Sequence, residues 1–139
     1  METPVAEKAL VAALETERRV AAAILFGSAA RGTSRPDSDV DVAVLAAGAE
    51  AGASLARDLI DVLGTLGLAA GRDVHLVELA RADPPLRRSV FAHGRVLFDR
   101  SEGRLRELEV RTLLECFDDE YLRRLIDEGH ERRLERALG

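Results

Sequence analysis

The fold is decided by the stretch Gly27-Ser28-Ala29-Ala30-Arg31-Gly32-Thr33-Ser34-Arg35-Pro36-Asp37-Ser38-Asp39-Val40-Asp41. It follows an apolar run, residues 20–26, and leads into a second apolar run, residues 40–45. Both runs are typical of buried strands. A Gly-Ser turn therefore follows one predicted strand, and after ten intervening residues two aspartates open the next strand.

The two aspartates carry the chemical signal of this stretch. Asp39 and Asp41 are spaced i, i+2, so a strand places both side chains on one face. Neighbouring carboxylates repel each other, and such a pair is typical of a site for a hard cation such as Mg²⁺. A glycine in the Gly27-Ser28 turn lets backbone N–H groups approach a phosphate. Ordinary loop chemistry would not require the turn and the carboxylates at a set distance, so the pattern favours phosphoryl or nucleotidyl transfer.

This stretch resembles the motif of the nucleotidyltransferase superfamily that includes DNA polymerase β, and most closely that of its smallest branch, the minimal nucleotidyltransferases (MNT). Eight positions within fifteen residues match the family pattern: Gly27, Ser28, Ala30, Arg31, Gly32, Ser38, Asp39 and Asp41. A match of this length in a strand–turn–strand context is specific. The resemblance implies an α/β, polymerase β-like nucleotidyltransferase fold, with a small mixed β-sheet packed with helices and further C-terminal helices.

The resemblance also implies roles for individual residues. Those expected to bind the nucleotide are Gly27, Ser28, Arg31 and Ser38. Arg31 would neutralise phosphate charge, although a surface salt bridge is an equal alternative. Asp39 and Asp41 are the expected catalytic carboxylates, and they would hold Mg²⁺ or Mn²⁺ between the nucleotide and the attacking group.

The third predicted strand departs from the family pattern. Members of the family generally carry a third carboxylate there, in the rhythm apolar-Asp-apolar-apolar, and the matching run is Val74-His75-Leu76-Val77. Three interpretations stay open. His75 acts as a ligand or acid–base group; Asp73, two residues earlier on the same face, supplies the third metal ligand; or the site has lost this group and much of its activity. A strand histidine with local hydrogen bonds only is an equal alternative to a role in the site.

The remaining elements alternate along the chain. Helices are expected over residues 4–19, begun by Thr3 and Pro4, over residues 51–66, with Gly67 as its stop, and over residues 84–93. Residues 73–79 and 95–99 are expected as strands, and residues 101–138 as two helices broken near Asp118. We expect one domain, with residues 1–100 as the nucleotidyltransferase core and residues 101–139 as its helical extension.

The composition argues against several other classes of function. The chain has 139 residues, 47% of them hydrophobic, and a net charge of −5, which argues against generic attraction to nucleic acid. No apolar run reaches the length of about 20 residues that spans a bilayer, and no signal segment opens the chain. The lone cysteine, Cys116, suits a reducing cytoplasm. Asn and Gln are absent, as in many thermophile proteins and also in proteins from GC-rich genomes.

Two functions follow as hypotheses. The first is an enzyme that transfers a nucleoside monophosphate from ATP or another NTP to a hydroxyl. Minimal nucleotidyltransferases are commonly paired with a HEPN-domain protein as antitoxin and toxin, so the resemblance implies a HEPN partner as acceptor. The second is a binding module that neutralises its partner by contact, with catalysis weakened at His75. Antibiotic modification is the weaker third option, because little chain is left for an added substrate domain. The apolar stripes of the C-terminal helices are also compatible with contact between two copies of the chain, so a homo-oligomer stays an alternative.

Overall fold

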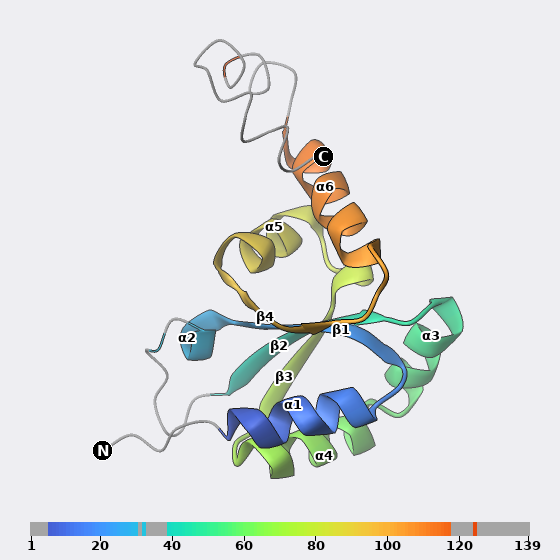
Figure 1. Cartoon of the computed structure of the whole chain (residues 1–139), viewed down its shortest axis with the longest axis vertical. Coiled ribbons are helices and arrows are strands. Elements are labelled where there is room, and N and C mark those ends of the chain that lie inside the picture. Colours follow the sequence, from blue (N-terminus) through green and yellow to red (C-terminus); the bar gives the residue numbers. More distant parts are fainter. Residues whose placement is uncertain (1–5, 31, 33–38, 118–123, 125–139) are drawn as a thin grey trace.

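The computed structural model of the chain describes residues 6–30, 32, 39–117 and 124. Four strands form one sheet in the order β3-β2-β1-β4, with helices on both faces (Figure 1). The strands are β1 (Val20–Phe26), β2 (Val40–Ala46), β3 (Val74–Glu78) and β4 (Arg95–Asp99). The architecture is the α/β, polymerase β-like arrangement that the sequence motif predicts.

The two central strands are the apolar runs that flank the motif. Residues 20–25 of β1 are buried, as are all residues of β2 except Asp41, because helices cover both faces of these strands. β2 lies antiparallel to β1 and parallel to β3, and β1 lies antiparallel to β4. The sheet is therefore mixed, as expected, and β3 and β4 are its edges.

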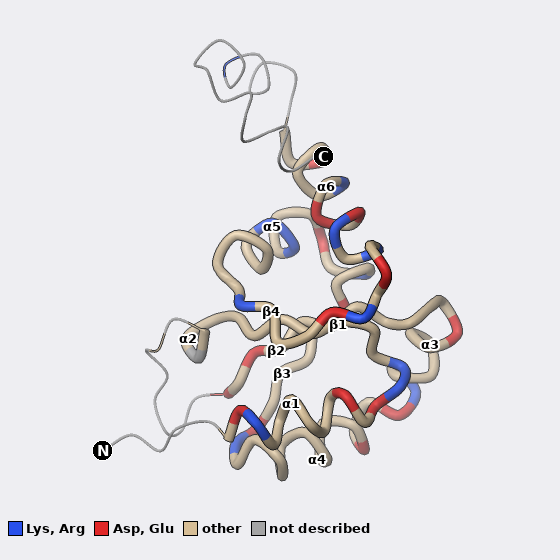
Figure 2. Tube along the Cα trace, viewed as in Figure 1, with Lys and Arg blue, Asp and Glu red and all other residues tan. Residues whose placement is uncertain are grey.

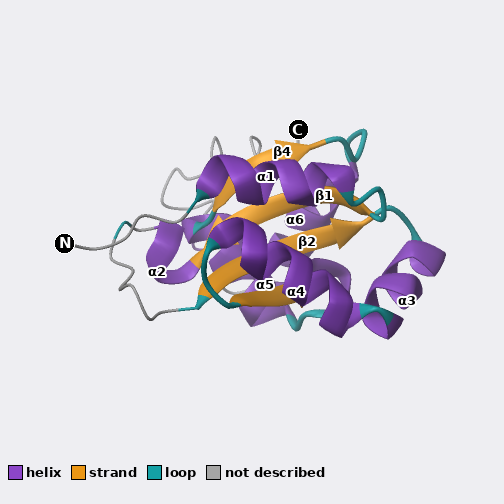
Figure 3. Cartoon of the chain, turned by 90° about the horizontal axis from the view of Figure 1, so that it is seen from below, coloured by secondary structure: helices purple, strands orange, loops and turns teal. Residues whose placement is uncertain are grey.

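One face of the sheet is covered by α1 (Glu7–Thr16) and α4 (Leu59–Ala70), which lie side by side (Figures 1 and 3). Leu10 and Leu14 of α1 and Val62 and Leu66 of α4 are buried against the valines of β2. These side chains recur at helical spacing of three to four residues, which places them on one stripe of each helix.

The other face is covered by α5 (Pro84–His93), α6 (Arg104–Cys116) and the short 3₁₀ helix η1 (Leu79–Arg81). Val90, Leu105 and Leu108 pack together there with the alternate residues of β1 and β2. The side chain of Asp83 caps α5 by accepting a hydrogen bond from the Leu86 backbone N–H, as expected for a helix with Pro at its first position. The first C-terminal helix thus completes the core.

The prediction of a single helix over residues 51–66 is wrong. Two helices stand there, α3 (Ala49–Arg57) and α4, and they meet at Asp58, whose backbone leaves the helical region. Gly67 does not stop the second helix, which continues to Ala70 and ends at Gly71 in the left-handed conformation (φ 69°). A helix tolerates Gly67 at modest cost when tertiary packing supports its neighbours, and Leu66 and Ala70 on either side are buried.

The expected helix start at Thr3 and Pro4, and the second C-terminal helix, lie outside the described residues. The other expected helices and strands are present with boundaries shifted by up to three residues. Within the part of the chain that the structure describes, there is no helix with both the length and the apolar character needed to cross a bilayer.

Candidate active site

The Gly-Ser turn and the aspartate strand meet at one end of the sheet. α2 (Gly27–Ala30) begins directly after β1, where Phe26 pairs with Asp41 of β2. Gly27 has a positive φ of 71°, and a Cβ added to it would collide with Oδ2 of Asp41. Glycine is therefore required twice, for its backbone conformation and for the space that the Asp41 carboxylate occupies.

His75 lies directly beside Asp41, because β3 runs parallel to β2 in the register that pairs these two residues. The Nδ1 atom of His75 is 3.2 Å from Oδ1 of Asp41, a hydrogen bond in which a protonated Nδ1 donates. The His75 side chain is 61% exposed and that of Asp41 is 29% exposed. The histidine therefore stands at the position expected for the third carboxylate, accessible to solvent and in contact with the site.

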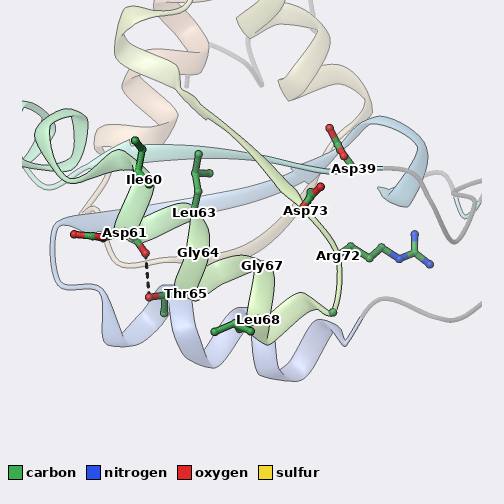
Figure 4. Close-up of a pocket in the computed structure, with 11 residues that line it drawn as sticks. Asp39, Ile60, Asp61, Leu63, Gly64, Thr65, Gly67, Leu68, Arg72 and Asp73 are labelled. Atoms are coloured by element: carbon green, nitrogen blue, oxygen red, sulfur yellow. Dashed lines mark hydrogen bonds between the residues drawn. The ribbon is translucent and has the colours of Figure 1, made fainter.

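Asp39 and Asp73 form a second pair next to the first. The Val40 N–H donates to the Asp73 carbonyl oxygen at 2.9 Å, so the two aspartates flank the same point of the β2–β3 ladder. Figure 4 shows both side chains at the same end of the two strands, and both residues are exposed. The structure thus places Asp39, Asp41, Asp73 and His75 at the ends of two adjacent strands, in two cross-strand pairs.

The expected nucleotide-binding residues are placed only in part. Gly27 and Ser28 open α2 and are half-buried, and the Ser28 side chain has interactions of its own. Arg31 and Ser38 lie outside the described residues, so their assignment remains a sequence-based prediction.

Whether these side chains fit a cation can be judged from their donor atoms. Carboxylate oxygens are the ligands that Mg²⁺ prefers, whereas imidazole suits Mn²⁺ or Zn²⁺ better. Oδ2 of Asp41 lies against Gly27, and Oδ1 contacts Nδ1 of His75. In the described ranges no three His, Cys, Asp or Glu side chains converge closely enough to hold a metal ion. Asp39 and Asp41 offer carboxylate oxygens from the same end of β2, and a cation bound there would need further ligands, from a substrate or from Asp73.

A groove beside the aspartates was missed by the sequence analysis. It has a volume of about 930 Å³ and runs from Asp39 and Asp73 along the outer side of α4, past Gly64 and Leu68 (Figure 4). The sequence of α4 contained a signal for this groove. Asp61 is the only charged residue among its twelve, whereas a surface helix normally carries a polar outer face.

Solved structures with the same fold include toxin–antitoxin proteins. One chain from a toxin–antitoxin structure with AMP-PNP is 23% identical, with a TM-score of 0.62 over 96% of this chain and 98% of that one. A chain from the MntA–HepT toxin–antitoxin structure is 20% identical, with a TM-score of 0.58 over 96% and 97%. A chain from the Shewanella oneidensis complex of a tri-AMPylated HEPN toxin with an MNT antitoxin is 20% identical, with a TM-score of 0.57 over the same shares.

The search of curated proteins gave no match. The model of the family described as polymerase beta, nucleotidyltransferase, matches residues 8–103. The matched range holds all four strands and every site residue discussed above. The chain therefore belongs to the polymerase β nucleotidyltransferase family.

Proposed function

We propose that the chain is an MNT-type antitoxin that transfers AMP from ATP to a hydroxyl of a HEPN-type protein toxin, in a reaction that depends on a divalent cation. The observation that carries this proposal is the contact between the Gly27 turn and the Asp41 carboxylate. It brings the expected phosphate-binding turn and the expected cation ligand to one point. Family membership and the fold shared with toxin–antitoxin structures, one with AMP-PNP and one with an AMPylated toxin, support the same conclusion.

The reaction forms one bond and breaks one. The acceptor hydroxyl oxygen bonds to the α-phosphorus of ATP, the bond from that phosphorus to the bridging oxygen of the β-phosphate breaks, and pyrophosphate leaves. The hydroxyl proton passes to a base. Asp73 and His75 are the candidates for the base, since they lie at the start of β3, next to the two aspartates at the start of β2. Positioned bases of this kind commonly contribute about 10²–10⁴-fold to a rate.

Mg²⁺ is the cation that suits the oxygen donors best. Asp39 and Asp41 would hold it, and Asp73 is the proposed third ligand. When bound, the cation neutralises charge that develops on the phosphate oxygens. The backbone at Gly27 and Ser28 would hold the outer phosphates, with Arg31 and Ser38 as further nucleotide-binding residues.

A second candidate function rests on His75. A histidine hydrogen-bonded to Asp41 takes the place of a carboxylate that would otherwise add an oxygen ligand. The chain would then be a nucleotidyltransferase-fold module that neutralises its partner by contact. The two functions differ in one respect: the contact module would still neutralise the toxin after Asp39→Asn and Asp41→Asn, whereas the enzyme would not.

The test uses the chain, a HEPN-type protein encoded beside it, and ATP labelled at either the α- or the γ-phosphate. We expect label on the HEPN-type protein from α-labelled ATP only, because nucleotidyl transfer retains the α-phosphate and releases the other two. Asp39→Asn should abolish this labelling. Label from γ-labelled ATP would indicate phosphoryl transfer instead. If the two proteins bind each other but neither form of ATP gives label, the result would favour the contact module.

A further inference from the structure

The outer side of α4 is unusual for a surface helix. Its inner side packs on the sheet through Val62, Leu66 and Ala70. On the outer side, Ile60 is 85% exposed and Leu68 is 88% exposed, the highest values among the large apolar side chains of the described residues. Gly64 stands between them at i+4, so the three positions lie on one stripe of the helix. Figure 2 shows this helix almost without charged residues.

This stripe forms one wall of the groove that ends at the active site. Ile60, Gly64 and Leu68 line it from α4, and Asp39 and Asp73 line its other end. Figure 4 shows the two carboxylates at the sheet end of the same hollow. β3, next to the groove, is an edge strand. A molecule lying along α4 would therefore reach the two aspartates without crossing another element.

The charge of the groove indicates which reactant fits it. Asp39, Asp61 and Asp73 contribute three carboxylates, and Arg72 contributes one guanidinium group. Asp39 and Asp73 are proposed cation ligands, so Asp61 is the groove carboxylate that the nucleotide site does not use. It would repel a triphosphate lying along α4, since like charges close together raise each other's energy. The Gly27 turn, where the triphosphate is expected, is not among the residues that line the groove. The groove thus suits the acceptor, the reactant that must place a hydroxyl beside Asp73 and His75.

We propose that the α4 groove binds the acceptor polypeptide, through a segment that carries apolar side chains for Ile60 and Leu68 and a basic side chain for Asp61, with the reacting hydroxyl at its sheet end. This inference rests on the proposed function, because it assigns the docking surface of that reaction. It makes α4 a determinant of which protein is modified, through residues other than the aspartates that are proposed to hold the cation.

The test replaces a groove residue by arginine, which removes the apolar contact and repels a basic segment. Ile60→Arg and Leu68→Arg should each weaken binding of the HEPN-type protein by about tenfold or more, as for an apolar anchor of an interface. Leu114→Arg on α6 is the matched control, since Leu114 is also an exposed helix-surface leucine, at 47%. It should bind the HEPN-type protein like the wild-type chain. All three variants should keep wild-type affinity for Mg²⁺–ATP.

Three measurements distinguish the outcomes: a calorimetric titration with the HEPN-type protein, a calorimetric titration with Mg²⁺–ATP, and labelling from ATP that carries its label on the α-phosphate. Unchanged protein affinity in Ile60→Arg and Leu68→Arg would overturn the groove proposal, even if labelling shows that the proposed function is right. Weakened protein affinity with no labelling by the wild-type chain would support the groove and refute the transfer reaction. A wild-type dimer that Leu68→Arg dissociates, seen by sedimentation, would assign the groove to a second copy and overturn the proposal.

Discussion

At the scale of single residues, the site depends on three contacts between neighbouring strands. Gly27 makes room for Asp41, His75 hydrogen-bonds to Asp41, and the backbone of Asp73 holds the strand of Asp39. Each contact joins two residues that are distant in the sequence, or separated by the motif loop. The spacing of the motif predicts that these groups meet, and the strand register determines which group lies beside which.

The collision at Gly27 gives a prediction with an internal control. Gly27→Ala and Gly103→Ala both place alanine at a positive φ, 71° and 92°, which costs about 1 kcal/mol of unfolding free energy. A Cβ at Gly103 meets no atom within 4 Å, whereas a Cβ at Gly27 displaces the Asp41 carboxylate. We therefore expect similar losses of stability by denaturant unfolding, but loss of Mg²⁺–ATP affinity in Gly27→Ala alone. Equal affinities in the two variants would mean that the turn is only structural.

The position of His75 gives a second prediction. His75→Asp would place a carboxylate against Asp41, so the metal-free protein should lose thermal stability through like-charge repulsion. Added Mg²⁺ should raise the Tm of this variant more than that of the wild-type chain, and transfer should be faster. If Asp73 already serves as the third ligand, Asp73→Asn should instead slow transfer strongly, and His75→Asp should add little.

The contrary result for His75 is equally specific. A wild-type enzyme that is already fast with Mg²⁺, and that both His75→Ala and His75→Asp slow down, would assign His75 a direct role as ligand or base.

At the scale of elements, the break between α3 and α4 is held in place by one arginine. Arg19, in the turn between α1 and β1, donates to Ser54 Oγ at 2.8 Å and to Asp58 Oδ2 at 2.7 Å. Its Nε also donates to Glu17 Oε1 at 2.7 Å. Asp58 is the residue at which the two helices meet. This cluster therefore fixes where α4 begins and supports the helix that forms the groove.

The same cluster gives a pH-dependent prediction. The hydrogen bond from Arg19 holds the pKa of Glu17 below its usual value of 4.5, against a smaller, opposite effect of burial. The stabilisation by Glu17 is thus fully present above about pH 4.5 and is lost as the pH falls through the lower pKa of the folded state. Glu17→Gln should lower the Tm at pH 7, and its difference from the wild-type chain should shrink at pH 3. Glu15→Gln, at an exposed position of α1, should leave the pH profile unchanged. A constant Tm difference across this range would contradict the role of the carboxylate.

The helices also show where sequence reasoning fails. Periodicity predicts the strands and α5 well, because apolar runs bounded by Gly and Pro leave few alternatives. It fails over residues 49–70, where Leu59 and Ile60 match the helical spacing of a buried stripe but are exposed. The break at Asp58 separates the following helix from α3, and it is supported by contacts of Arg19 with Ser54 and Asp58, which join residues too distant in the sequence for periodicity to register. The sequence analysis missed the groove because it counted Ile60 in a buried stripe, whereas this side chain is exposed and lines the groove.

At the scale of the whole molecule, the two sides of the site have different chemistry. By strand alternation, Asp41 lies on the face of Ala43 and Leu45, which α5 and α6 cover. The groove runs along the outer side of α4 (Figure 4). The sheet end between them carries Asp39, Asp73 and His75. The nucleotide and the acceptor would thus approach the aspartates from different sides, which is the arrangement that transfer between two bound molecules requires.

The division of the chain into a core of residues 1–100 and an extension of residues 101–139 remains a prediction. The family match ends at residue 103, and α6 packs on α5 through Leu105 and Leu108. The sequence predicts the core well because one motif specifies a turn, two strands and a carboxylate pair together.

The most direct test of the account is a calorimetric titration of Mg²⁺–ATP into the wild-type chain and into Asp39→Asn and Asp41→Asn. Both aspartates are proposed to hold the cation that accompanies the nucleotide, so each substitution should weaken binding by at least about tenfold, a loss of about 1.4 kcal/mol. The fold should stay intact, because removing one of two neighbouring carboxylates relieves repulsion in the metal-free protein. Unchanged Mg²⁺–ATP affinity in both variants, with circular dichroism like that of the wild-type chain, would show that these carboxylates do not form a nucleotidyltransferase site.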